Sequence, residues 1–280
     1  GMVMVLDWSG SMADNLKGTL AQLYNLIWFC RRTKIPFEVF AFSDQYSKTD
    51  RWDADEIKNR AMSNFKAGNL VVADFKLLNF FSSNLTVSDE MDMMHILWMY
   101  ASRWNGYRDW KKDGHPYNSP LNLNLGGTPL NDAIIAMMEL LPKFKADTGV
   151  QKVNTIFLTD GCSHRLNGIF DYRLDTDTGE HKEVIENLPY DYRRNDFILS
   201  DRVMNKTYKI SDVTNDLLVI LKNRVREMNV VGFFIAGTGK TGRVDKRTLY
   251  WLLPEEDRGT IMEKIKFVNK NKYLALDQLG

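Results

Sequence analysis

The sequence predicts an α/β protein with a doubly wound, mostly parallel six-stranded sheet, helices on both faces, and an inserted loop and hairpin region. Short, continuously apolar segments bounded by polar turns are typical of parallel strands that are covered on both faces. They alternate with longer segments in which apolar residues recur every three or four positions, as in amphipathic helices. The ligand crevice of such a sheet lies at the carboxyl ends of its strands.

The expected strands and helices follow one another in the order that this fold class requires. In the first expected helix, Leu16, Leu20 and Leu23 repeat with helical spacing, and Asp212 is suited to cap the last one. The expected strands are residues 3–6, 37–42, 74–81, 153–159, 230–236 and 272–276. The expected helices are residues 12–32, 89–103, 129–144 and 211–228.

Two segments interrupt this alternation and are expected to be insertions. Residues 105–125 are rich in Trp, Tyr, Asn, Gly and Pro, which predicts a long loop. Residues 163–210 are polar, and a turn signal at residues 177–179 predicts a β-hairpin. We therefore expect a single domain over residues 1–280 with these two insertions. Because the first strand begins almost at residue 1, we also expect the chain to be part of a longer protein.

The composition argues against several classes of partner. The 37 basic and 36 acidic side chains leave a formal charge of +1, so we do not expect nucleic-acid binding. No apolar run approaches the roughly 18 residues that cross a bilayer, so we expect no membrane partner. The two cysteines, Cys30 and Cys162, are too few for a disulfide framework. A cytoplasmic location is the resulting expectation.

Three short motifs place oxygen-bearing side chains at predicted strand ends or helix starts. They are Asp-Trp-Ser-Gly-Ser at residues 7–11, Gly-Gly-Thr-Pro-Leu at residues 126–130 and Leu-Thr-Asp-Gly at residues 158–161. Each motif alone is a common turn or helix cap. Together they provide oxygen ligands only, with two carboxylates among them, which suits a hard divalent cation. The sequence thus predicts a Mg²⁺ site, with Mn²⁺ or Ca²⁺ as alternative ions, formed by Asp7, Ser9, Ser11, Thr128 and Asp160.

The three motifs, in this order, resemble the metal-ion-dependent adhesion site of the von Willebrand factor A (VWA) domain family. The resemblance extends from residue 3 to about residue 236, apart from the two insertions. It implies a Rossmann-like sheet of strand order 3-2-1-4-5-6 with one antiparallel edge strand, for which residues 74–81 are the candidate.

The resemblance also implies a role for each ligand. Ser9, Ser11 and Thr128 would contact the metal directly or through water. Asp7 and Asp160 would act mostly through bridging waters, and an acidic side chain of a partner would fill the remaining coordination position. A cation held by only two carboxylates keeps residual positive charge, which attracts such a side chain.

The Gly-Gly-Thr-Pro-Leu motif is most similar to an intracellular branch of the family, which includes the cobaltochelatase VWA subunit and the VWA partners of MoxR-type AAA+ ATPases. We therefore expect a protein-interaction domain without catalytic activity of its own, as a subunit of an AAA+ ATPase or chelatase-like complex. The general character of the sequence suggests a phage or bacterial source.

Two other functions stay open at this point. A metal-dependent enzyme would need a base or nucleophile near Asp160, and Cys162 and His164 are the nearest candidates in the sequence. An RNA-binding module resembling the VWA half of Ro-type proteins would use the aromatic and basic stretch at residues 98–117 for base stacking. Salt-dependent retention of RNA would separate this last function from protein binding.

Overall fold

The computed structural model describes most of the chain and groups it into two compact units. The units are Gly1–Phe233 and Phe234–Gly280, whereas one domain was expected. The described residues are 1–44, 66–70, 72, 75–104, 123–161, 163, 169–176, 178–186, 198–210, 212–235, 244, 246, 249–250, 253, 259–271 and 273–274.

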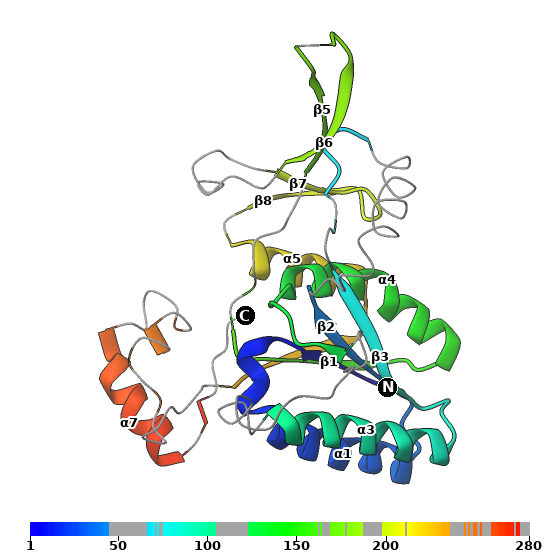
Figure 1. Cartoon of the computed structure of the whole chain (residues 1–280), viewed down its shortest axis with the longest axis vertical. Coiled ribbons are helices and arrows are strands. Elements are labelled where there is room, and N and C mark those ends of the chain that lie inside the picture. Colours follow the sequence, from blue (N-terminus) through cyan, green and yellow to red (C-terminus); the bar gives the residue numbers. More distant parts are fainter. Residues whose placement is uncertain are drawn as a thin grey trace, which may run out of the picture. The chain divides into compact units, whose positions relative to one another are not determined.

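The first unit is built around a mixed five-stranded sheet of order β3-β2-β1-β4-β9 (Figure 1). β1 pairs in parallel with both β2 and β4, whereas β2 and β3 are antiparallel. The expectation of an antiparallel edge strand near residues 74–81 is confirmed by β3. The strands are β1 (Met2–Asp7), β2 (Phe37–Ser43), β3 (Lys76–Ser82), β4 (Val153–Thr159) and β9 (Met228–Phe234).

The prediction of a six-stranded, mostly parallel, Rossmann-like sheet is wrong. Among the described residues the sheet has five strands, and Tyr273 and Leu274, the described part of the expected strand at residues 272–276, have no regular structure. Leu274 instead packs against the hydrophobic cluster around Ile261 and Val268 in the second unit. The physical reason for the error is that a short apolar run has the same pattern in a strand and in a chain end packed on a helix.

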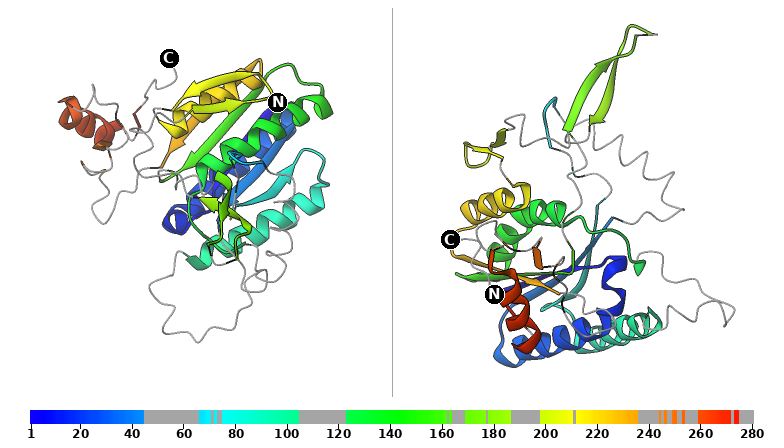
Figure 2. Two further views of the ribbon diagram at one scale, coloured as in Figure 1. Left: turned by 90° about the horizontal axis from the view of Figure 1, so that it is seen from above. Right: turned by 90° about the vertical axis from the view of Figure 1, so that its left-hand side faces the viewer.

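Helices cover both faces of the sheet (Figure 1; right-hand view of Figure 2). On one face, Val3 and Val5 of β1 pack with α4 and α5. On the other, Met4 and Leu6 pack with α1 and α3, because successive side chains of a strand point to opposite faces. The helices are η1 (Gly10–Asp14, a 3-10 turn), α1 (Leu16–Thr33), α3 (Val87–Trp104), α4 (Leu130–Thr148) and α5 (Val213–Arg224).

The predicted insertion at residues 163–210 contains two antiparallel hairpins. One consists of β5 (Ile169–Leu174) and β6 (His181–Glu186), and the other of β7 (Ile198–Asp201) and β8 (Lys206–Lys209). Gly179, in the turn of the first hairpin, has a φ of +70°, a conformation that favours glycine. Most of the predicted loop at residues 105–125 lies outside the described residues.

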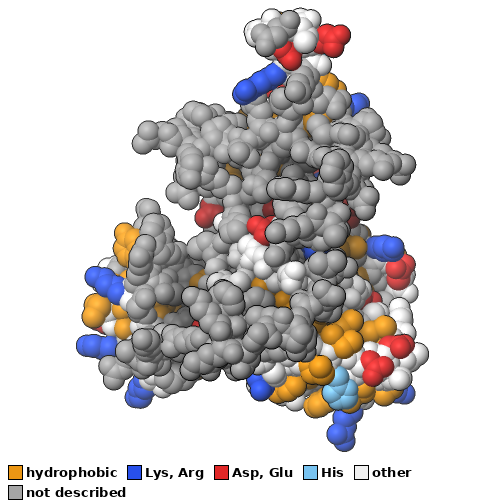
Figure 3. Space-filling view, viewed as in Figure 1, with side chains coloured by type: hydrophobic (Ala, Val, Ile, Leu, Met, Phe, Trp, Pro, Cys, Tyr) orange, Lys and Arg blue, Asp and Glu red, His pale blue; other side chains and the backbone are white. Residues whose placement is uncertain are grey.

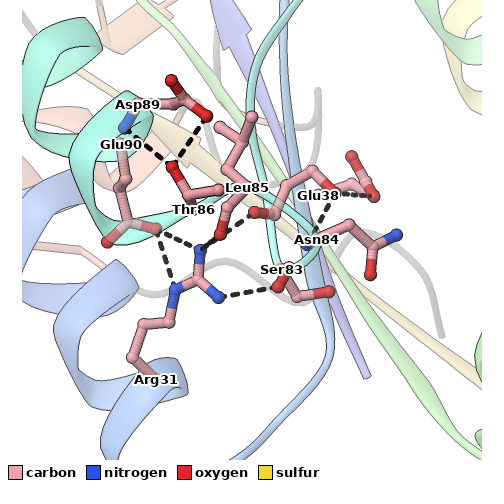
Figure 4. Close-up of polar contacts among 9 residues, drawn as sticks. Arg31, Glu38, Ser83, Asn84, Leu85, Thr86, Asp89 and Glu90 are labelled. Atoms are coloured by element: carbon pink, nitrogen blue, oxygen red, sulfur yellow. Dashed lines mark hydrogen bonds and ion pairs between the residues drawn. The ribbon is translucent and has the colours of Figure 1, made fainter.

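An arginine clamp holds the start of α3 against α1 at the edge where β2 begins (Figure 4). The Arg31 guanidinium donates from Nε and Nη2 to the Glu90 carboxylate at 2.8 and 2.7 Å. It also donates to the carbonyl oxygens of Ser83 and Leu85 at 2.6 and 3.0 Å. A planar group with five donors satisfies several acceptors at once, so this one side chain fixes the turn that leads into α3.

The second unit contains α7 (Ile261–Asn271), whose buried residues Ile261 and Val268 pack with Leu249 and Leu253. In the first unit, exposed hydrophobic side chains gather over the outer faces of α1 and α3 in Figure 3. They include Trp28, Phe29, Ile96 and Met99. Within the part of the chain that is described, no helix is both long and apolar enough to cross a membrane.

Candidate metal centre

Two of the predicted ligands lie at the ends of neighbouring parallel strands. β1 ends at Asp7, and β4, which pairs with it in the register Leu6 opposite Leu158, ends one residue before Asp160. The carboxyl ends of parallel neighbours share one edge of the sheet. The strand register therefore brings both carboxylates to the same edge, as the sequence predicted.

Backbone hydrogen bonds tie the second motif to the first. Gly10 N donates to Gly126 O at 2.8 Å, and Gly126 N donates to Trp8 O at 3.2 Å. Ser9 and Gly126 accordingly form a parallel bridge beyond the end of β1. The indole of Trp8, which is 1% exposed, donates to Leu123 O at 2.7 Å and so anchors the segment that precedes the glycine pair.

The hydroxyl groups of the first motif extend toward the Asp160 carboxylate. Ser11 Oγ donates to Asp160 Oδ1 at 2.7 Å, and Ser9 Oγ lies 3.0 Å from Ser11 Oγ. Thr128 lies beside the residue that follows Asp160, since a Cβ on Gly161 would be 3.6 Å from Thr128 Oγ1. All three motifs therefore meet at one edge of the sheet.

Asp7 is the buried anchor of this cluster. Its Oδ2 accepts a 2.6 Å hydrogen bond from Thr159 Oγ1, whereas its Oδ1 is buried and has no hydrogen-bond partner. Burial raises the pKa of Asp7 to about 6, against the opposing effect of the hydrogen bond from Thr159. Burial also raises the pKa of Asp160, and the hydrogen bond from Ser11 opposes this effect. Both carboxyl groups are thus held where their negative charge is poorly solvated.

These residues fit a hard divalent cation. An unpartnered oxygen on a buried carboxylate is an acceptor for which the folded chain supplies no donor. A serine hydroxyl that donates its proton, as Ser11 does to Asp160, keeps lone pairs for a cation. No group of three or more His, Cys, Asp and Glu side chains gathers in the described ranges, so any ion here would depend on hydroxyl oxygens as well.

Three polar residues near this edge were not predicted from the sequence. Thr159 bonds to Asp7, as described above. Asp44, just beyond β2, accepts a hydrogen bond from Gly127 N of the second motif. Asp132, in the first turn of α4, is 1% exposed, and burial raises its pKa to about 7, with a further contribution from the charge of Asp44. The only sequence signal for Asp44 was its place directly after an expected strand.

The residues behind the alternative functions are only partly described. Cys162 and His164 lie outside the described residues, as does most of the aromatic stretch. Ser163, between them, accepts a 2.9 Å hydrogen bond from Asn131 N and so caps the start of α4. This contact gives the loop after Asp160 a structural role.

Comparisons with known proteins assign no family to the chain. No protein-family model matches it, and no curated protein matches it. Among solved structures it is similar to the pilus adhesin SpaC from Lactobacillus rhamnosus GG in an open conformation, with 14% sequence identity and a TM-score of 0.43. The match covers 96% of this chain but 30% of the adhesin chain, so the protein spans less than a third of that relative's length. A likeness this distant identifies neither the fold family nor the function.

Proposed function

We propose that the protein is a Mg²⁺-dependent protein-interaction domain with a VWA-type metal-ion-dependent adhesion site. The observation that carries the proposal is the buried, unpartnered Oδ1 of Asp7 beside a cluster of hydroxyl groups. A buried carboxylate oxygen without a partner costs free energy, and a cation at this edge of the sheet is the partner that the surrounding oxygens favour.

In this proposal the five predicted residues have two different roles. Ser9, Ser11 and Thr128 would hold Mg²⁺ with their hydroxyl oxygens. Asp7 and Asp160 would orient those hydroxyls and the bound waters, and the bond from Ser11 to Asp160 is already of that kind. When bound, the ion would offer an open coordination position to an oxygen ligand. Asp160 is half-buried, so the site is accessible from solvent on its side.

The partner in this proposal is a protein that offers an Asp or Glu side chain. Two carboxylates neutralise a divalent cation only formally, and hydroxyl ligands add no charge, so a third carboxylate is attracted strongly. An AAA+ ATPase of the MoxR type or a chelatase-like complex is the partner class that the sequence motifs favour. We also propose a cytoplasmic location, because the chain has only two cysteines and Cys30 is a buried free thiol.

Affinity capture tests this function directly. The full chain, immobilised and incubated with a lysate of its native host, is expected to retain the same partners in repeated captures with Mg²⁺ and to release them in EDTA. Asp7→Ala should reduce capture at least tenfold, because it removes the carboxylate that orders the site. Quantitative mass spectrometry of the captured proteins provides the measurement.

The matched control is Asp92→Ala, which removes an exposed carboxylate from the surface of α3. It should leave capture unchanged. An acidic residue of a captured partner, changed to the corresponding amide, should weaken binding as much as EDTA does. Equal capture by Asp7→Ala, or in EDTA, would contradict the proposal.

A further inference from the structure

Asp132 is a buried carboxyl group for which the described chain supplies no partner. It lies in the first turn of α4, after the cap residue Pro129, and its side chain is 1% exposed. Neither of its carboxyl oxygens has a hydrogen-bond partner. Acidic residues are favoured in the first turn of a helix, but usually at the surface, where water solvates the charge. Helix stabilisation alone therefore does not account for this burial.

A second carboxylate, that of Asp44, faces the same helix start. Asp44 lies two residues beyond Phe42, which is paired with Asp7 across the β1–β2 ladder. Its Oδ1 accepts a hydrogen bond from Gly127 N, which orients the group toward the segment that leads into α4. Its negative charge adds to burial in raising the pKa of Asp132. The Asp44 charge thus lies close enough to Asp132 to disfavour the ionised form of Asp132.

This pair is separate from the ligands of the first site. The charge that acts on Asp7 is that of Asp160, whereas the charge that acts on Asp132 is that of Asp44. Asp7 ends β1 and Asp160 follows β4. Asp44 follows β2, and Asp132 lies in the first turn of α4. The four carboxyl groups therefore form two neighbouring pairs.

A proton on Asp132 is the simplest alternative, but it leaves the polar atoms unsatisfied. A protonated carboxyl group has one donor and still has acceptor oxygens, and both of its oxygens lack a partner here. A cation between Asp44 and Asp132 would satisfy the oxygens of Asp132 and would remove the repulsion between the two charges. Mg²⁺ is often held by one or two carboxylates and several waters, so two protein ligands are sufficient.

We propose that Asp44 and Asp132 hold a second hard divalent cation of the Mg²⁺ class, beside the N-terminus of α4 and independent of the ion proposed for the Asp7 site. Asp132 supplies the buried ligand, and the half-buried Asp44 supplies the ligand on the side from which the ion enters. This second site does not depend on the partner-binding function proposed above.

Counting bound Mn²⁺ tests this inference. The metal-free full chain, titrated with Mn²⁺ and followed by electron paramagnetic resonance of the free ion, should bind two ions per chain. Asp132→Asn should bind one, because the amide keeps the shape of the side chain but loses its charge. Asp44→Asn, at a half-buried position, should likewise bind one, and the exposed control Asp92→Asn should bind two.

Asp7→Asn separates the two sites, because it should also bind one ion and leave the Asp44–Asp132 site filled. The unaltered chain could also bind a single ion. If Asp132→Asn and Asp44→Asn lose that ion and Asp7→Asn keeps it, the result supports the second site and contradicts the first. If Asp132→Asn and Asp44→Asn both bind two ions, this inference is wrong and the proposed function stands. The same holds if the unaltered chain binds a single ion that only Asp7→Asn loses. Circular dichroism in EDTA confirms that each variant is folded.

Discussion

At the scale of single residues, Asp7 links the stability of the metal-free protein to the chemistry of the site. Burial raises its pKa to about 6, from an ordinary value of 3.8. The folded, metal-free chain therefore holds this proton more tightly than the unfolded chain does. Protonated Asp7 contributes stability that is fully present below about pH 4 and is lost as the pH rises toward 6. At neutral pH the ionised group destabilises the metal-free fold.

Asp7→Asn is consequently expected to stabilise the metal-free protein at high pH. In EDTA at about pH 8 the gain should be about 2–3 kcal/mol, because a pKa difference of about two units corresponds to that free energy. At about pH 4 the gain should disappear. Urea unfolding at the two pH values gives the comparison.

Addition of Mg²⁺ should reverse the order at about pH 8, because the unaltered chain binds an ion at the Asp7 site that the variant does not bind, and ligand binding stabilises the folded chain. The unaltered protein would then be the more stable of the two. A variant that is less stable than the unaltered chain in EDTA at both pH values would show that the Asp7 charge is well compensated without metal.

Residue types and spacing identified some of the polar residues that gather at the carboxyl ends of the strands and missed others for a physical reason. Three motifs with fixed internal spacing carry Asp7, Ser9, Ser11, Thr128 and Asp160, and the structure brings all three motifs together. Asp44 and Asp132 are single acidic residues, and apart from the place of Asp44 just beyond an expected strand the local sequence does not distinguish them from surface carboxylates. Their burial depends on how β2 and α4 pack, which is tertiary information.

At the scale of secondary-structure elements, the clamp of Arg31 joins α1 to the turn between β3 and α3. Ser82 pairs with Glu38 near the start of β2, so the clamp lies at the opposite end of the strand from the candidate metal centre. Thr86 and Asp89 add a reciprocal cap at the start of α3, with hydrogen bonds of 2.7 and 3.2 Å. The clamp therefore acts on the fold and not on the site.

Arg31→Ala should destabilise the protein by about 3 kcal/mol, because it leaves the buried carboxylate of Glu90 and several carbonyl oxygens without a donor. The neighbouring Arg32→Ala, at an exposed position of the same helix, should change stability by less than about 0.5 kcal/mol. Urea unfolding measures both. Metal affinity of the folded Arg31→Ala chain should stay the same, and a loss of affinity would mean that the two ends of the strands are coupled.

At the scale of the whole molecule, the pattern of apolar segments predicted the order of the main elements but not the number of strands. Continuous apolar runs identified β1, β2, β4 and β9, and helical spacing identified α1, α3, α4 and α5. The expected sixth strand at residues 272–276 was wrong because a short apolar run has the same pattern in a strand and in a segment packed on a helix, as Leu274 is against the cluster around Ile261 and Val268. α7 itself was not among the expected helices, although Ile261, Ile265 and Val268 repeat with helical spacing.

The central claim is that three turns from distant parts of the first unit form one oxygen-only cation site. Crystals of the protein grown or soaked with Mn²⁺ and measured at the manganese absorption edge test it most directly. The account predicts an anomalous peak within coordination distance, about 2.0–2.3 Å, of hydroxyl oxygens of Ser9, Ser11 and Thr128. If those residues have clear density and no anomalous peak lies among them, the account is contradicted. It is also contradicted if the three hydroxyl groups lie far apart from one another.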